Sequence, residues 1–119
     1  MKPGETGWTV RVSKGVDSFE FTIGGANRPD ARLLSHAHDI LSDFESFKKV
    51  VRECIESESR DYPEDIKAEL AALEIDNISL AWPKRPDDGM IFFRGYDEDF
   101  GLWRCDYIAR KPVGLGCDR

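Results

Sequence analysis

The sequence predicts an α+β domain of two layers, with helices packed on one face of an antiparallel sheet. Residues 31–59 repeat apolar side chains at spacings of three and four, as a helix with one buried face does. On both sides of this stretch, short segments alternate apolar and polar residues, which is the period of a half-buried strand. The length of 119 residues suits one domain, residues 1–119, with a single core.

The segment before the helix predicts a β-hairpin. Residues 7–13 and 18–23 each alternate apolar and polar side chains, and Gly15 between them is expected at positive φ. A turn centred on Lys14 and Gly15 places Val10 opposite Phe19, so that the apolar faces of the two strands coincide. Residues 24–30 break this alternation and are expected to form a loop. Their glycines match neither phosphate-binding motif, so no phosphate site is expected there.

The central stretch predicts one long helix from about Ala31 to Ser59. Its apolar stripe consists of Leu33, Leu34, Ala37, Ile40, Leu41, Phe44, Phe47, Val51 and Ile55. A second, shorter helix is expected from Pro63 to Leu73, since proline is favoured at the start of a helix. Tyr62 precedes this proline and is therefore biased away from helical ψ, which separates the two helices.

Three further strands are expected, over residues 77–82, 90–96 and 102–110. The loop 83–89 contains two prolines, which exclude it from the centre of a sheet. The tail, residues 111–119, is too rich in glycine and proline to predict regular structure. Short turns join successive strands, so we expect about five antiparallel strands with the long and the shorter helix on one face.

The charge balance favours a protein partner. The 17 Lys and Arg residues and 23 Asp and Glu residues give a formal charge of −6. Nucleic-acid binding depends on cations that neutralise phosphates, so this composition disfavours it and instead favours a basic protein. No signal-peptide pattern follows Met1 and no apolar run approaches the roughly 18 residues of a membrane span. We therefore expect a cytoplasmic protein without a membrane partner.

No motif identifies a reaction, so we expect no catalytic residue, metal site or cofactor. Cys54, Cys105 and Cys117 have no zinc-binding spacing, and reduced thiols are expected. His36 and His38 lie two residues apart on the predicted helix, so their side chains point to nearly opposite sides and do not chelate one ion. Two alternatives stay open: a small metal-dependent hydrolase that uses one of these histidines, and a structural or assembly subunit.

Carboxylates grouped in two loops are the candidate docking residues. They are Asp87 and Asp88 in the first loop, and Asp97, Glu98 and Asp99 in the second. Residues 56–65 form a further acidic stretch. None of these segments matches the ligand spacing of an EF-hand. They are either ordinary solvated turns or an acidic docking surface for a basic partner.

The last two strands predict a second interaction surface. A symmetric turn over residues 97–101 places Phe92 opposite Cys105, with both side chains toward the helices. The opposite face then carries Ile91, Phe93, Leu102 and Ile108, with Arg104 and Asp106 beside them. A face with this many large apolar groups needs a cover. The candidates are Val113 and Leu115 of the tail, a second copy of the chain in a homodimer, and another protein.

The closing residues carry a resemblance to a known group of proteins. Residues 101–108, Gly-Leu-Trp-Arg-Cys-Asp-Tyr-Ile, and residues 111–118, Lys-Pro-Val-Gly-Leu-Gly-Cys-Asp, are similar to the end of small bacterial domains of unknown function. The order of two strands, helix and three strands is also that of several such families, some of which are immunity proteins of toxin–immunity pairs. The resemblance implies a binding protein that blocks a toxin. It implies no individual site residue.

Overall fold

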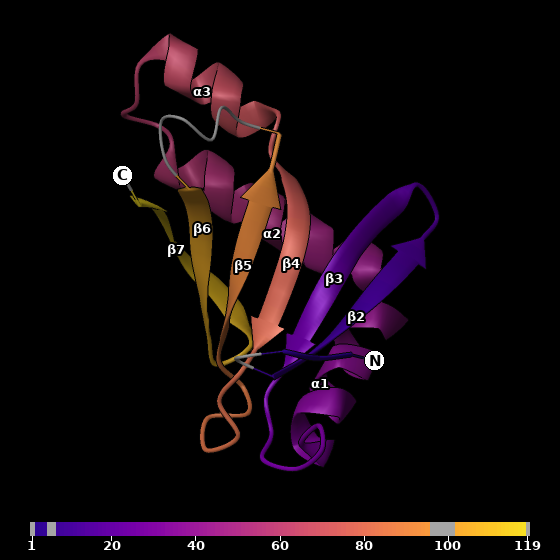
Figure 1. Ribbon diagram of the computed structural model, residues 1–119. Coiled ribbons are helices and arrows are strands. Elements are labelled where there is room, and N and C mark those ends of the chain that lie inside the picture. Colours follow the sequence, from indigo (N-terminus) through magenta and orange to yellow (C-terminus); the bar gives the residue numbers. More distant parts are fainter. Residues whose placement is uncertain (1, 5–6, 96–101, 119) are drawn as a thin grey trace.

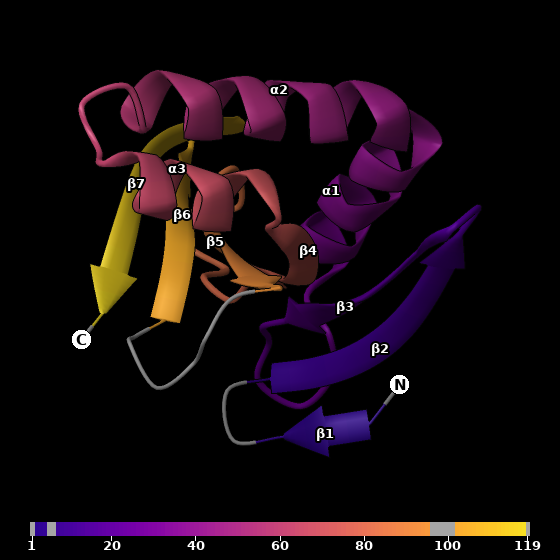
Figure 2. The ribbon, with the colours of Figure 1, turned by 90° about the horizontal axis from the view of Figure 1, so that it is seen from above.

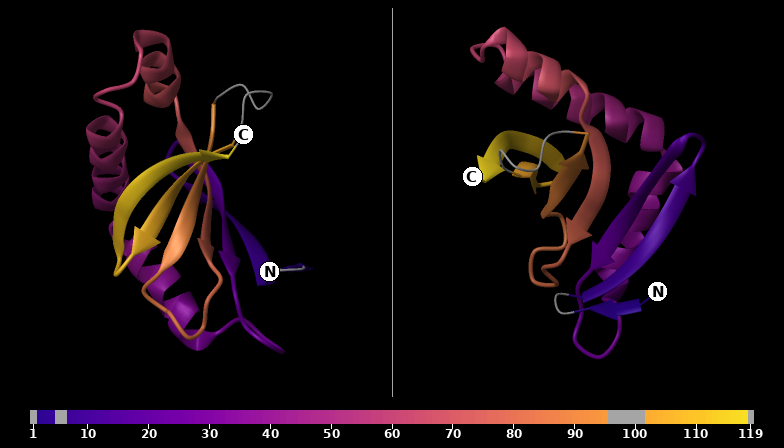
Figure 3. Two further views of the ribbon diagram at one scale, coloured as in Figure 1. Left: turned by 90° about the vertical axis from the view of Figure 1, so that its left-hand side faces the viewer. Right: turned by 45° about the horizontal axis from the view of Figure 1, so that its top comes forward.

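The computed structural model describes residues 2–4, 7–95 and 102–118 and confirms the α+β class (Figure 1). The strands among these residues are β1 (Lys2–Gly4), β2 (Gly7–Lys14), β3 (Asp17–Ile23), β4 (Glu74–Leu80), β5 (Gly89–Arg94), β6 (Leu102–Ile108) and β7 (Lys111–Asp118). The helices among them are α1 (Ala31–Ser42), α2 (Phe44–Glu58) and α3 (Glu64–Ala71). They all lie toward the same side of the sheet (Figure 3, left).

The core lies between the helices and the face of the sheet that they cover. The helix stripe contributes buried Leu33, Ala37, Ile40, Phe44, Val51 and Ile55. The sheet contributes Phe19, Phe21, Ile23, Ile78, Leu80, Ile91, Phe93, Trp103, Cys105 and Tyr107. Burial of side chains of this size stabilises the fold by about 1.5–3 kcal/mol each before chain entropy is subtracted. Among the described residues, no helix is both long enough and apolar enough to cross a membrane.

The sheet is mixed, so the prediction of a purely antiparallel sheet is wrong in one place. Its spatial order follows the sequence from β1 to β7, and every neighbouring pair among the described strands is antiparallel except β3 and β4. These two are parallel because residues 24–73 carry the chain through all three helices and back to the end of the sheet from which β3 began. The parallel pairing joins residues 20–23 to residues 77–80.

The tail forms the edge strand β7, so the prediction that it lacks regular structure is wrong. Along β6 it pairs Cys105 with Leu115 and Trp103 with Cys117. An edge strand tolerates proline, and Pro112 lies next to the point where the register of this pair shifts. The short strand β1, which pairs with β2 at the other edge, was also not expected.

The predicted long helix is two helices that meet at Asp43. This residue has φ −141° and ψ 58°, outside the helical region, and α2 continues from it through a hydrogen bond from Phe47 N–H to the Asp43 carbonyl. Figure 2 shows α1 and α2 running in different directions over the curved sheet. The apolar spacing does not reveal the break, because Asp43 lies between two residues of the stripe, Leu41 and Phe44.

The strand registers differ from the predicted ones in two ways. In the first hairpin Val10 faces Phe21 and the turn is Gly15-Val16, a shift of two residues that leaves the apolar faces together. Gly15 has φ +62°, as expected. In the pair β5–β6, Phe92 faces Arg104 and Ile91 faces Cys105, a shift of one residue that exchanges the faces of β5.

Candidate functional site

A pocket of about 340 Å³ lies where β3 and β4 separate. The two strands pair only from Glu20 and Asn77 onward, so their first residues diverge, and α2 closes the gap from behind (Figure 1). The apolar residues that line the pocket are Phe19, Phe44, Val51, Ile55, Leu73, Ile75 and Phe93. The charged ones are Asp17, Glu45, Lys48, Lys49, Arg52, Glu74 and Arg94. We call this site the β3–β4 pocket.

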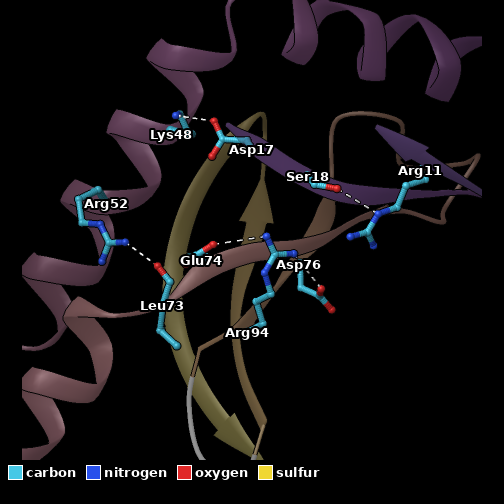
Figure 4. Close-up of polar contacts among 9 residues, drawn as sticks. All are labelled: Arg11, Asp17, Ser18, Lys48, Arg52, Leu73, Glu74, Asp76 and Arg94. Carbon is cyan, nitrogen blue, oxygen red and sulfur yellow. Dashed lines mark hydrogen bonds and ion pairs between the residues drawn. The ribbon is translucent and has the colours of Figure 1, made fainter. Parts of the chain in front are cut away.

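Ion pairs occupy both sides of the β3–β4 pocket (Figure 4). On the β3 side, the Lys48 ammonium donates to Asp17 at 2.7 Å and lies 3.1 Å from Glu45. These hydrogen bonds raise the pKa of Lys48, so that it stays charged. On the β4 side, the Arg94 guanidinium lies 3.4 Å from Glu74 and 3.3 Å from Asp76. Each of these cations therefore has two carboxylate neighbours.

Arg52 is held differently from the other paired cations. Its two terminal nitrogens donate to the carbonyl oxygens of Leu70 at 3.1 Å and Leu73 at 2.7 Å, at the end of α3. Among the described residues, no carboxylate forms an ion pair with Arg52 or with the exposed Lys49. The carbonyl dipoles fix the Arg52 guanidinium in place without cancelling its charge.

Sequence reasoning did not identify the β3–β4 pocket. The available signal was weak: Lys48 and Arg52 lie one helical turn apart and directly beside the apolar stripe. The partners Asp17, Glu74 and Arg94 come from three different strands. They line one pocket only because β3 and β4 diverge at this end of the sheet.

His36 is buried in the second cluster of polar side chains. Its Nδ1 lies 2.8 Å from the Pro86 carbonyl oxygen and its Nε2 lies 3.1 Å from the Tyr107 hydroxyl. Because a carbonyl only accepts, Nδ1 carries the proton and Nε2 accepts the Tyr107 O–H. Burial lowers the pKa of His36 and raises the pKa of Tyr107 to about 12. Both groups are therefore neutral at pH 7.

Asp87 and Asp88 hold the turn between β6 and β7. Asp88 accepts from the Ala109 N–H at 2.8 Å, and Asp87 accepts from the Arg110 side chain at 2.7 Å. Ala109 and Arg110 have φ values of 52° and 64°, a left-handed conformation that is uncommon for residues other than glycine. Arg110 also donates to Asp39 on α1 at 3.0 Å. Both predicted docking carboxylates thus have partners within the chain.

A shallow cleft of about 250 Å³ lies beside this cluster, between the helices α1 and α2 and the β6–β7 turn. His36, Asp39, Tyr107 and Arg110 contribute to its lining. Since both nitrogens of His36 are engaged in hydrogen bonds, the geometry does not support the hydrolase alternative at this residue. His38 is exposed on α1.

Glu53, one helical turn before Glu56 on α2, adds one more carboxylate to the acidic stretch of residues 56–65. Residues 53–65 contain six carboxylates and one cation, Arg60, which gives a net charge of −5. We call this part the acidic α2–α3 segment; its carboxylates are Glu53, Glu56, Glu58, Asp61, Glu64 and Asp65, all of them exposed. Among the described residues only Glu64 of these six forms an ion pair, with Lys67 at 3.6 Å.

The acidic α2–α3 segment is fixed to the sheet by aromatic and polar contacts. The ring of Tyr62 packs edge-on against Trp103, with centroids 6.1 Å apart. The Trp103 indole N–H donates to Glu69 on α3 at 3.3 Å. The segment therefore presents its charge from a fixed position at one end of the molecule (Figure 1).

The predicted placement of Ile91 and Phe93 on the outer face of the sheet is wrong. They are 0% and 3% exposed and face the helices, whereas Phe92 lies on the outer face opposite Arg104. The run of residues 90–93 is apolar throughout, so its pattern did not select a register. Arg104 and Asp106 do lie on the outer face, paired at 3.1 Å. Asp97, Glu98 and Asp99 lie outside the described residues.

The thiols and histidines do not gather into a metal-binding group. Among the described residues, no three or more His, Cys, Asp or Glu side chains lie together as metal ligands would. Cys54 and Cys105 do approach each other, with their sulfur atoms 3.9 Å apart between α2 and β6. Burial raises the pKa of Cys105 to about 12, which keeps this thiol protonated and a poor nucleophile.

The chain matches no family model, no curated protein sequence and no solved structure.

Proposed function

We propose that the protein is a non-enzymatic cytoplasmic binding protein, whose acidic α2–α3 segment docks against a basic protein. The observation that carries the proposal is the concentration of charge: residues 53–65 hold a net −5, and the whole chain holds −6. Exposed charges of one sign attract an oppositely charged partner over a distance and speed its association. A nuclease toxin that binds nucleic-acid phosphates has such a basic surface. We therefore propose specifically that the protein inhibits a nuclease toxin.

The fixed position of the segment supports this function. Carboxylates on an ordered surface lose less conformational freedom on binding than carboxylates on a mobile tail. Because five of the six are not paired with a described cation, a partner need not first break an internal ion pair. Such an association weakens as salt increases, because the charges are exposed.

The experiment compares two triple variants of equal net charge. Glu53→Gln/Glu56→Gln/Asp65→Asn removes three charges from the segment, and Asp39→Asn/Asp43→Asn/Glu45→Gln removes three exposed carboxylates elsewhere. Each variant and the wild-type protein are used to capture partners from native lysate, and the captured protein is then titrated in purified form. We expect the first variant to bind about tenfold more weakly and the control to bind as the wild type does.

Three results test the proposal directly. Inhibition of nuclease activity by the wild-type protein would support the toxin-blocking form. Equal weakening by both triple variants would contradict a role for the segment, and so would an affinity that does not depend on salt.

A second surface supports self-association as another candidate. On the outer face of β6, Leu102 and Ile108 are 41% and 38% exposed. They flank the Arg104–Asp106 ion pair, an arrangement typical of a polar contact within an apolar interface. Light scattering of the purified protein tests whether a second copy covers this face. A monomer at high concentration would contradict a homodimer.

A further inference from the structure

We propose that the β3–β4 pocket is a binding site for a small organic acid, with its carboxylate at Arg52 and Lys49 and its apolar body toward the helix. None of the six carboxylates of the acidic α2–α3 segment lines this pocket, so either proposal can fail without the other. The inference depends on three features: the volume of the pocket, the charge of its walls and the way in which Arg52 is held.

The volume suits a ligand with one aromatic ring and a carboxylate. Small-molecule sites commonly enclose about 300–1,000 Å³, and a cavity of roughly 150 Å³ holds benzene. The β3–β4 pocket, at about 340 Å³, lies within that range. Its apolar wall includes Phe19 and Phe44, whose rings stack with centroids 4.7 Å apart. These rings are only 1% and 2% exposed and form the floor of the pocket, and half-buried Ile75 offers the more accessible apolar contact for a ligand body.

Two cations in the pocket wall are available to an anion. Of the described residues that line the pocket, four are cations and three are carboxylates, although the chain as a whole is acidic. Lys48 and Arg94 each form ion pairs with two carboxylates, one of which, Asp76, does not line the pocket. Arg52 and Lys49 are the lining cations that form no ion pair with a described carboxylate.

The hydrogen bonds of Arg52 prepare it for such a ligand. Its guanidinium is partly buried and fixed by the Leu70 and Leu73 carbonyl oxygens, so it loses little freedom when an anion binds. A partly buried cation without a carboxylate partner is also less stable than a paired one, and a ligand carboxylate supplies the missing charge. Arginine suits this role because its planar donor groups match a carboxylate.

The test uses phenylacetate as the probe and ¹⁵N-labelled full-length protein. We expect saturable shifts of the backbone amides at residues 17–19 and 74–76, with a dissociation constant of about 1 mM or tighter. The neutral analogue phenylacetamide should bind at least tenfold more weakly to the same wild-type protein. This comparison does not depend on any variant folding correctly.

Two single variants locate the charge that recognises the probe. Lys49→Gln, at an exposed side chain, should weaken phenylacetate binding at least threefold. Arg11→Gln removes one cation outside the pocket and should leave the affinity unchanged. The proposal is overturned if about 10 mM phenylacetate causes no saturable shifts. Equal binding of phenylacetamide or of inorganic phosphate would also overturn it, as would equal weakening by both variants.

Discussion

His36 on α1 and Tyr107 on β6 share a hydrogen bond inside the molecule, with Nε2 and the hydroxyl oxygen 3.1 Å apart. The second nitrogen of His36 donates to the Pro86 carbonyl, so one side chain joins a helix, a strand and the β4–β5 loop. Arg110, Asp87 and Asp39 surround this contact and affect the charge that His36 can carry.

The stability of the protein should decrease as the pH falls below about 6.5. Burial lowers the pKa of His36 in the folded chain from its ordinary value of 6.5. Below pH 6.5 the unfolded chain takes up a proton that the folded chain resists, which favours unfolding. Above pH 6.5 the contribution of His36 is fully present. Urea unfolding at pH 7.5, 6.0 and 5.0 measures this loss.

A matched pair of variants assigns that loss to His36. His36→Gln should be less stable at pH 7.5, because buried partners lose a hydrogen bond, and should lack the decrease between pH 6.5 and 5.0. His38→Gln, at an exposed position, should keep the wild-type profile. If the decrease persists in His36→Gln, another group causes it.

The register of β5 predicts losses of stability of different size for two adjacent phenylalanines. Phe93 is 3% exposed in the core, so Phe93→Ala should lower the free energy of unfolding by about 3–5 kcal/mol. Phe92 lies half-buried on the outer face, so Phe92→Ala should lower it by only about 1 kcal/mol. Chemical denaturation of both variants gives the two values. The reverse ranking would show that β5 is shifted by one residue.

The left-handed turn between β6 and β7 predicts a stabilising glycine. Ala109 has φ 52°, where glycine is not penalised by a Cβ atom, so Ala109→Gly should raise the free energy of unfolding by about 0.5–1 kcal/mol. Ala68→Gly, at an exposed position within α3, should instead lower it by about 1 kcal/mol. Thermal and urea unfolding give the sign of each change. A loss of stability in Ala109→Gly would mean that this turn is not left-handed in solution.

The helices could be predicted from the sequence more accurately than the sheet. The stripe of Leu33, Ala37, Ile40 and Phe44 shows which face of the helix is buried, because apolar residues recur at spacings of three and four over several turns. By contrast, residues 90–93 are apolar on both faces of β5, so no alternation distinguishes one register from the other. The break at Asp43 depends on how α1 and α2 follow the curvature of the sheet, which no local pattern records.

The candidate sites depend on contacts between distant residues. Asp87 and Asp88 are ordinary acidic loop residues in the sequence, and only the fold brings them to Ala109 and Arg110. Arg52 likewise meets the carbonyl oxygens of Leu70, in α3, and Leu73, just after it, through the packing of two helices. The acidic stretch could be found from composition alone, because it consists of consecutive residues.

The strands lie side by side in the order in which they occur in the sequence, and this has a consequence for the folding pathway. The first hairpin and the β4–β7 group close through local connections, whereas the four residue pairs between β3 and β4 join segments separated by residues 24–76. Closing that long loop costs more chain entropy, so the parallel pair should form late, after two separate nuclei have formed. The β3–β4 pocket lies at this junction. An organic acid that binds there would therefore stabilise the strand pair that forms last and slow the separation of the first hairpin from the β4–β7 group.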